Sequence, residues 1–394
     1  MELQIGQFEV LLLVAALVAI LAARLRVPYV VGLVAAGIAL SFFHLQPELD
    51  LTKELVFTAL LPPLVFEAAL YLRWQQLRRE LPVVLLLATA GVAISAFVTA
   101  LGMVYVVQWA WPSALIFGVL IAATDPVSVI ASFKEQHVHG RLRLLVEAES
   151  LLNDGTAAVG FALALSFAQG MNVGGASIPI ALLTTSLGGI ACGAAVAGLM
   201  LLIAGRTTNN LIELTLTTVV AYGSFLLADH FGLSGVLATV TAGLLVGNVG
   251  PLGSISAQGR ASVQGFWEYA AFIANSIIFL LIGIHEAEQP FALILPAIAV
   301  AILFVLLGRA LSVYPLCALF ARSRLRVTMP HQHVLFWGGL RGALALALAL
   351  GLPAEMPQAN EIVRVTFAVV AFSVFVQGLT MGPLLRRLGE VPGR

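Results

Sequence analysis

Long apolar runs separated by short polar segments repeat along the whole chain. Most of these runs have the length of a transmembrane α-helix, which needs roughly 20 largely apolar residues. The pattern predicts about 13 spanning helices and therefore an all-α polytopic membrane protein. The helices are expected near residues 8–23, 29–43, 55–72, 81–108, 113–133, 143–169, 178–205, 211–230, 233–249, 266–284, 290–320, 329–352 and 360–387. The polar stretch 253–265 is expected to lie at the membrane interface.

The composition supports this prediction. Of the 394 residues, 60% are hydrophobic and only 10% are charged. Soluble domains carry about 25% charged residues, because they must cover their surface with polar groups. The low charge excludes an ordinary cytosolic enzyme, a nucleic-acid-binding protein and a disordered chain.

Basic residues are distributed asymmetrically between the predicted loops. When alternate loops are assigned to the same side, one side holds all but four of the 20 Lys and Arg residues. The four exceptions are Lys53, Arg309, Arg341 and Arg364. Because cytoplasmic loops carry an excess of Lys and Arg, we expect the N-terminus outside and the C-terminus in the cytoplasm. The predicted location is the cell membrane, inner or plasma, with multiple passes.

Among the 13 predicted helices, each of the first six corresponds to the helix seven places later in the chain. An odd offset reverses the orientation, so the chain is predicted to contain two inverted six-helix repeats. The helices at 113–133 and 329–352 are paired by this offset, and both are interrupted. Asp125-Pro126 interrupts the first and a glycine-rich stretch around Arg341 interrupts the second. Paired interrupted helices indicate a binding site in secondary transporters.

Four ionisable residues are predicted near the bilayer midplane: Glu67, Asp125, Asp154 and Arg341. Each lies 11 or 12 residues into its helix, or roughly 16–18 Å at 1.5 Å per residue. The hydrocarbon core is about 30 Å thick. Ionisable groups at this depth are energetically costly and are functional candidates.

Glu149 and Arg309 are predicted to form a second layer of charge, in the cytoplasmic half of the membrane. An ion pair between them would compensate both buried charges. We expect this pair to have a structural role.

The Thr124-Asp125-Pro126 interruption has a local physical logic. Proline suits the first turn of a helix, and Asp125 before it is a favourable N-cap that complements the positive helix end. Thr124 would end the preceding half-helix with free carbonyl oxygens, which are cation ligands. We expect Arg341 to face the negative end of the half-helix that it follows.

The segment from Glu149 to Gly155 combines several polar side chains on one helix. Ser150 and Asp154 share a face because they are four residues apart, and Glu149 and Asn153 share the neighbouring face. Asp154, Ser150 and the Thr124 backbone carbonyl, together with Glu67, could supply the oxygen ligands of a monovalent cation. For Ser150, an ordinary interhelical hydrogen bond is an equally open interpretation.

Five motifs carry a resemblance to a known family. In sequence order they are Leu61-Pro62-Pro63-Leu64-Val65-Phe66-Glu67, Ala123-Thr124-Asp125-Pro126-Val127, Glu149-Ser150-Leu151-Leu152-Asn153-Asp154-Gly155, Gly308-Arg309, and Gly338-Gly339-Leu340-Arg341-Gly342-Ala343. Together they resemble the NhaP/NHE-type sodium–proton antiporters of the monovalent cation:proton antiporter superfamily. The resemblance covers essentially the whole chain.

The resemblance implies a role for each candidate residue. Asp154 would be the carboxylate that binds the cation or the proton, with Ser150, Thr124 and Glu67 assisting. Asp125 and Asn153 would shape the helix crossing, and Arg341 is placed with them. Glu149 would pair with Arg309. The neighbouring residues Asn153-Asp154 would go with electroneutral exchange of one cation for one proton.

The resemblance also implies an organisation. Residues 1–394 would form one membrane transport domain, with a core bundle near 81–169 and 290–387 that moves against dimer helices near 8–72 and 178–284. A homodimer is expected. Because few residues follow the last predicted helix, we expect no cytoplasmic regulatory domain.

The function expected from all of this is exchange of a monovalent cation for H⁺ by alternating access. Na⁺ is favoured, also Li⁺, and a K⁺/H⁺ antiporter of the same architecture is the alternative. A cation channel is disfavoured because no repeated pore loop or ring of equivalent charges is visible. An intramembrane enzyme is disfavoured because the histidines lie in loops or at helix ends. We expect no enzymatic activity, no cofactor and no nucleic-acid partner; the partners are the two ions and the lipid bilayer.

Overall fold

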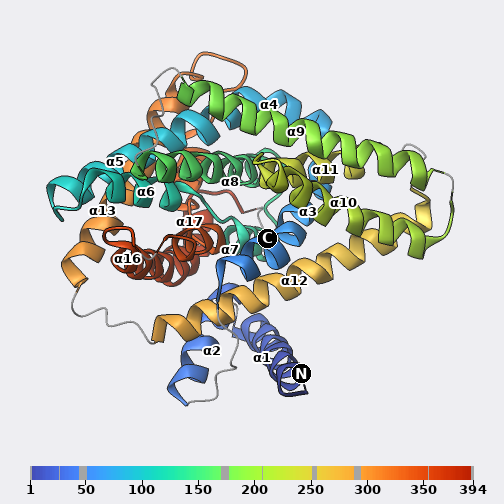
Figure 1. Ribbon diagram of the computed structural model, residues 1–394, viewed down its shortest axis with the longest axis horizontal. Coiled ribbons are helices and arrows are strands. Elements are labelled where there is room, and N and C mark those ends of the chain that lie inside the picture. Colours follow the sequence, from blue (N-terminus) through green and yellow to red (C-terminus); the bar gives the residue numbers. More distant parts are fainter. Residues whose placement is uncertain are drawn as a thin grey trace.

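The computed structural model describes residues 2–25, 27–43, 51–169, 177–205, 207–250, 255–287, 294–353 and 355–391. Within these ranges every regular element is a helix (Figure 1). The elements in the first half are α1 (Glu2–Leu25), α2 (Tyr29–Phe42), η1 (Leu55–Leu60), α3 (Leu61–Tyr71), α4 (Trp74–Leu86), η2 (Leu87–Gly91), α5 (Val92–Tyr105), α6 (Trp111–Ala122), α7 (Val127–Glu135), α8 (Arg141–Ala168) and α9 (Ser177–Ala204). Those in the second half are α10 (Asn210–His230), α11 (Gly235–Val249), α12 (Ala257–Ala287), α13 (Leu295–Ala318), α14 (Met329–Trp337), α15 (Ala343–Leu350), α16 (Ala359–Phe372), η5 (Ser373–Gly378) and α17 (Leu379–Arg387).

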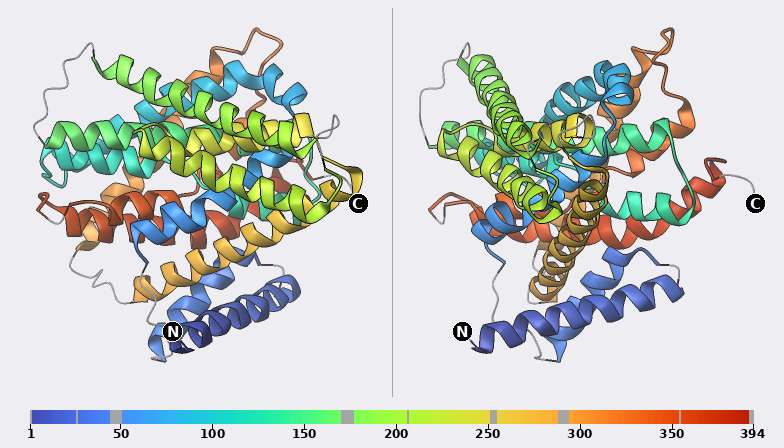
Figure 2. Two further views of the ribbon diagram at one scale, coloured as in Figure 1. Left: turned by 45° about the vertical axis from the view of Figure 1, so that its right-hand side comes forward. Right: turned by 90° about the vertical axis from the view of Figure 1, so that its right-hand side faces the viewer.

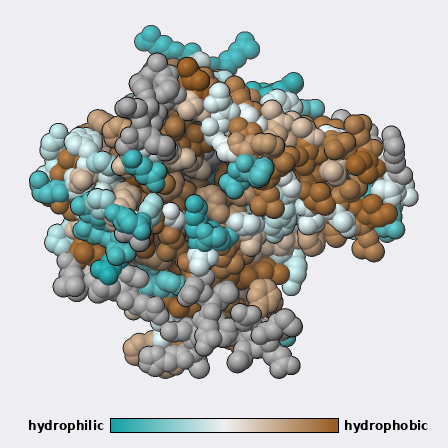
Figure 3. All heavy atoms as spheres, in the orientation of Figure 1, coloured by the Kyte–Doolittle hydropathy of each residue, from teal (hydrophilic) through white to brown (hydrophobic). Residues whose placement is uncertain are grey.

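These elements follow the predicted order of spans. The π-helical turns η1, η2 and η5 join their neighbours end to end, so that η1–α3, α4–η2–α5 and α16–η5–α17 each form one longer helical segment. Nine helical segments in the described residues are long and apolar enough to cross a membrane, and α2, η1–α3 and α11 are shorter apolar helices. Hydrophobic atoms cover much of the right-hand part of the surface in Figure 3, where Figure 1 places α9, α10 and α12. The predicted all-α polytopic membrane fold is confirmed.

Three helix starts were predicted too late. The helices expected at 8–23, 81–108 and 266–284 begin at Glu2, Trp74 and Ala257. The polar stretch 253–265 is therefore helical from Ala257 onward, while residues 253 and 254 lie outside the described residues. Hydropathy detects only the apolar part of a helix, whereas backbone hydrogen bonding continues into polar turns whose side chains reach solvent or partners.

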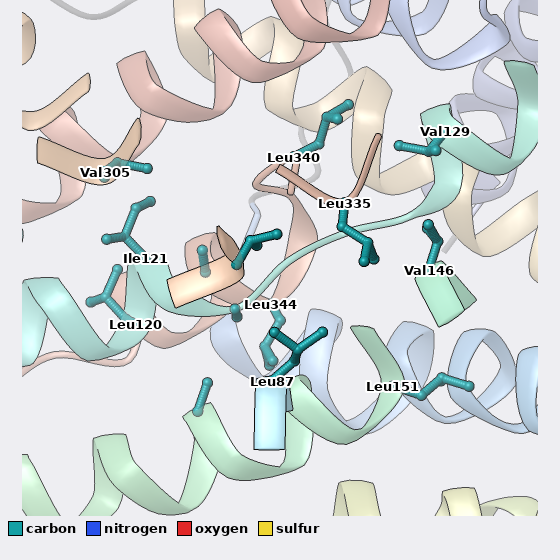
Figure 4. Close-up of a cluster of buried hydrophobic side chains, with 14 of the residues drawn as sticks. Leu87, Leu120, Ile121, Val129, Val146, Leu151, Val305, Leu335, Leu340 and Leu344 are labelled. Carbon is teal, nitrogen blue, oxygen red and sulfur yellow. The ribbon is translucent and has the colours of Figure 1, made fainter. Parts of the chain in front are cut away.

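Buried apolar side chains of the described residues form one large cluster and three smaller ones, the smallest of which contains Val92, Ala96 and Ala122. The large cluster joins mainly α4–α8 to α13–α17, and Figure 4 shows part of it, including Leu120, Val146 and Leu344. A second cluster joins α2, η1 and α12 to α15 and α16. A third joins α3 and α9–α12. Both views in Figure 2 place α1 and α2 at one edge of the molecule and α9 at the opposite edge.

Candidate functional site

Two interrupted helices meet at the centre of the site. α6 ends at Ala122 and α7 begins at Val127, while α14 ends at Trp337 and α15 begins at Ala343. The Asp125 N–H donates a hydrogen bond to the Leu340 carbonyl oxygen over 2.7 Å, so the two breaks are in direct contact. Figure 4 shows the extended chain of the first break between Ile121 and Val129, with Leu340 on the second break. Both predicted interruptions are confirmed.

Asp125 bridges the first turns of two half-helices. Its Oδ1 accepts a hydrogen bond from the Val127 N–H over 2.9 Å, and its carboxylate also accepts from the Ala343 N–H. These N–H groups are the positive ends of α7 and α15, which a carboxylate stabilises. The predicted capping of α7 by Asp125 is therefore present, and the same side chain also caps α15. A Cβ atom on Gly342 would overlap this carboxylate, so the position requires glycine.

Arg341 compensates the partial negative charge at the end of a half-helix, but this half-helix is not the one expected. The Arg341 side chain is only 1% exposed, and its Nη1 donates to the carbonyl oxygens of Ala122 and Ala123 over 2.7 and 3.1 Å. These carbonyls belong to the negative C-terminal end of α6, whereas we expected the end of α14. The sequence does not show how far a long side chain extends across the crossing, so this detail could be settled only in three dimensions.

Arg309 occupies the position that was expected for Arg341. Its Nε and Nη2 donate to the Leu335 carbonyl oxygen in the last turn of α14, over 3.2 and 2.9 Å. Its Nη1 and Nη2 also hold Glu149 Oε1 and Oε2 over 2.8 and 3.0 Å. Both side chains are buried, and the predicted ion pair between them is confirmed.

Asn153 connects this ion pair to the first break. Its Nδ2 lies 3.3 Å from both Glu149 Oε1 and Thr124 Oγ1, and it donates to each. Its Oδ1 is buried without a hydrogen-bond partner in the described part of the chain. The amide therefore fixes the Thr124 side chain relative to α8, as expected for a residue that shapes the crossing.

Ser150 and Thr124 place two oxygen atoms side by side. Ser150 Oγ donates to the Thr124 backbone carbonyl over 2.5 Å, and both residues are buried. A carbonyl oxygen has a second lone pair, and a hydroxyl oxygen keeps its own lone pairs after donating. Both of the interpretations left open for Ser150 are thus compatible with this contact.

A cavity of about 330 Å³ collects the predicted cation-binding residues. Asp154, Ser150, Thr124, Asp125 and Glu67 all line it. Its walls come from the first break, α7, α8 and α15 on one side and from α2, α3 and α12 on the other. Asp154 is half-buried and faces this space from α8. The structure therefore brings together the four residues that the sequence proposed as cation ligands.

Charged residues surround the mouth of the cavity. Lys134 and Glu268 line it and are exposed, and Arg143 forms an ion pair with Glu147 over 2.7 Å. Glu67 and Asp154 line the same cavity as these four charged residues.

α2 and α12 contribute cavity residues that the sequence pattern had not indicated. Tyr29 lines the cavity, donates or accepts a hydrogen bond with Ser276 Oγ over 2.6 Å, and stacks on Phe272. Glu268 and Asn275 line it from α12. Their spacing of seven residues places both on one helix face, and this pattern could have indicated a polar face on α12.

Crossed half-helices beside a buried carboxylate, within an all-helical membrane fold, define the class of secondary transporters. Residues 11–387 match the family described as "Sodium/hydrogen exchanger, transmembrane". The chain belongs to this family.

Comparisons with individual proteins support the same family assignment. The chain is 38% identical over 371 residues to the Na(+)/H(+) antiporter ApNhaP of Aphanothece halophytica, covering 94% of this chain and 71% of that protein. It is 35% identical over 348 residues to the Na(+)/H(+) antiporter NhaP of Pseudomonas aeruginosa, covering 85% and 81%. The structure of the sodium proton antiporter MjNhaP1 from Methanocaldococcus jannaschii at pH 8 shares the fold, with a TM-score of 0.77, 21% identity and 98% of both chains covered.

Proposed function

We propose that this protein exchanges Na⁺, and also Li⁺, for H⁺ across a cell membrane, one cation for one proton. The observation that supports this most directly is the cavity shared by Asp154, Ser150, Thr124 and Glu67 at the crossing of the two broken helices. The names of the relatives describe the same exchange.

Competition at Asp154 supplies the exchange mechanism. A carboxylate in the interior of a membrane protein is costly as a bare anion, so Asp154 holds either a proton or a cation. The Ser150 hydroxyl and the Thr124 carbonyl oxygen lie beside each other on the same cavity wall and complete the oxygen ligands. Because one site holds one ion at a time, Na⁺ must displace the proton and the proton must displace Na⁺.

Asn153 is consistent with an electroneutral cycle. It stands next to Asp154 but carries a neutral amide, and this amide bonds to Glu149 and Thr124. Glu149 is neutralised by Arg309. Asp154 would then be the carboxylate at the helix crossing whose charge changes during the exchange.

The cavity walls support alternating access. Asp154 faces the cavity from α8, in the proposed core bundle (81–169 and 290–387), whereas Glu67 and Asn275 face it from the proposed dimer helices (8–72 and 178–284). A site at the boundary between two bodies changes its accessible side when one body moves past the other. We propose a homodimer, an outside N-terminus and a cytoplasmic C-terminus, so that the cavity mouth beside Lys134 and Arg143 opens to the cytoplasm.

Proteoliposomes test this function. An imposed pH difference is expected to dissipate when Na⁺ or Li⁺ is added, at a rate unchanged by an imposed membrane potential. Asp154→Asn is expected to abolish the response while the protein remains folded, and Glu355→Gln, at an exposed position, is the matched control. A response to K⁺ alone would favour the K⁺/H⁺ alternative, and full activity of Asp154→Asn would overturn the site assignment.

A further inference from the structure

One face of α12 leads away from the cavity toward the opposite end of the helix. Glu268 and Asn275 line the cavity, and Phe279, Ile282 and Glu286 continue along the same face at spacings of four, three and four residues. Figure 1 shows α12 as one long helix. At 1.5 Å per residue, Glu286 lies about 27 Å from Glu268 along the axis. This face therefore reaches across the molecule from the cavity mouth.

Phe279 and Ile282 close the middle of this face. They are 2% and 0% exposed, and they belong to the same buried cluster as Leu346 of α15 and Phe367 of α16. The cluster also contains residues of α2. Within it, Phe279 and Ile282 place apolar side chains between Asn275 and Glu286 on this face of α12, and we refer to these two side chains as the apolar barrier.

Glu286 lies beyond this barrier and has no role in the site described above. It is only 6% exposed, and its Oε1 is buried without a hydrogen-bond partner among the residues that the structure describes. Its neighbour His285 stacks on Phe367, with ring centroids 5.9 Å apart, so this end of α12 remains in contact with α16. A buried carboxylate oxygen without a partner is costly unless a proton or a cation satisfies it.

We propose that Glu286 is a second ion-binding carboxylate, on the access route between Asp154 and the side of the membrane opposite the cavity mouth. The proposal rests on the cation–proton exchange proposed above. When α15 and α16 move away from α12, the barrier at Phe279 and Ile282 opens and the face from Asn275 to Glu286 becomes continuous. Glu286 then accepts a cation or a proton from that side and passes it to Asp154. It holds one ion at a time, so the balance of one cation for one proton is unchanged.

A sided transport assay tests this role. Exchange is measured in right-side-out and everted membrane vesicles, with Na⁺ supplied at either face. Glu286→Gln, which keeps the shape but removes the charge, is expected to raise the apparent KM for Na⁺ by about tenfold at the face nearest Glu286, the scale of one lost charge-assisted contact. The KM at the cavity face is expected to stay unchanged.

The control is Glu355→Gln, which removes an exposed carboxylate. If Glu286→Gln and this control have the same KM at both faces, the proposal is wrong. Failure of the proposed function itself is distinguishable, because the unmodified protein would then show no exchange at either face.

Thiol labelling tests the route without changing Glu286. Ile282→Cys is introduced after Cys192 and Cys317 are replaced by alanine, and a membrane-impermeant thiol reagent is added at the face nearest Glu286. We expect Ile282→Cys to be labelled during exchange. The control Leu281→Cys, equally buried but on another face of α12, is expected to stay unlabelled. Protection of Ile282→Cys under these conditions would overturn the proposed route.

Discussion

Asp125 and Arg341 each compensate charge on the other broken helix. Asp125, in the break between α6 and α7, accepts a hydrogen bond from the first turn of α15. Arg341, in the break between α14 and α15, donates to the carbonyl oxygens at the end of α6. Backbone groups at half-helix ends have no partner within their own helix. The two side chains therefore fix the crossing as one unit, and neither break is complete without the other.

Arg341→Met is expected to destabilise the protein by about 2–6 kcal/mol. The substitution leaves the carbonyl oxygens of Ala122 and Ala123 buried without their donor, and each unsatisfied buried group costs about 1–3 kcal/mol. Unfolding of the protein in detergent, induced by heat or by denaturant, measures this loss of stability. The control is Arg387→Met, at an exposed position near the end of α17. Equal stability of the two variants would contradict the proposed role of Arg341.

Glu149→Gln is expected to cost about 3–5 kcal/mol of stability, because it leaves the Arg309 charge buried without its counter-ion. The double variant Glu149→Gln with Arg309→Met is expected to be less destabilised than the single variant, because the unpaired charge is gone. The double variant is not expected to regain full stability, because the Leu335 carbonyl oxygen loses its hydrogen-bond donor.

A second ion pair on α8 provides the control for Glu149. Arg143 and Glu147 are also in contact, but both are partly exposed, and such pairs contribute about 0–1 kcal/mol. Glu147→Gln is therefore expected to change the unfolding free energy by less than about 1 kcal/mol. A loss as large as that of Glu149→Gln would show that burial is not the cause.

Gly342→Ala is expected to disrupt the crossing and to reduce exchange strongly. The added Cβ would overlap the Asp125 carboxylate, which cannot withdraw without losing its bonds to the first turns of α7 and α15. Gly198→Ala in α9 is the control, because among the described residues no atom outside the neighbouring backbone of α9 lies within 4 Å of its added Cβ. In a helix, that change is expected to be neutral or slightly stabilising. The assay is exchange in proteoliposomes, and similar rates for both variants would refute the packing argument.

The sequence predicted the parts of this site that depend on local pattern. Helix periodicity placed Ser150 and Asp154 on one face, and Asp125-Pro126 marked the helix break. The sequence did not predict that Arg341 contacts α6 while Arg309 contacts α14. Both side chains are long, so each could reach the C-terminal end of either helix. The sequence also missed Asn275 and Tyr29, whose importance depends on which helices pack opposite α8. Tertiary packing decides such contacts, and periodicity within one helix carries no information about them.

Ser150→Ala is expected to weaken cation binding by roughly 2- to 13-fold, the range of one lost polar contact. The substitution removes a hydroxyl that lies against the Thr124 carbonyl in the cavity. The control is Thr156→Ala on the same helix, whose hydroxyl bonds only to the Leu152 carbonyl of its own helix among the described contacts. The apparent KM for Na⁺ in proteoliposomes is the measurement. An unchanged KM for Ser150→Ala would leave Ser150 with helix packing as its role.

Lowering the pH is expected to raise the apparent KM for Na⁺ without changing the rate at saturating Na⁺. Protons and Na⁺ compete for Asp154, so a higher proton concentration requires more Na⁺ to occupy the same site. In the acidic range, where the carboxylate is mostly protonated, the KM is expected to rise by about tenfold for each unit of pH, because one proton is displaced per cation bound. Initial exchange rates measured over a series of pH values and Na⁺ concentrations give this slope. A KM independent of pH, together with a maximal rate that falls in acid, would indicate separate sites for the two ions and would contradict competition at Asp154.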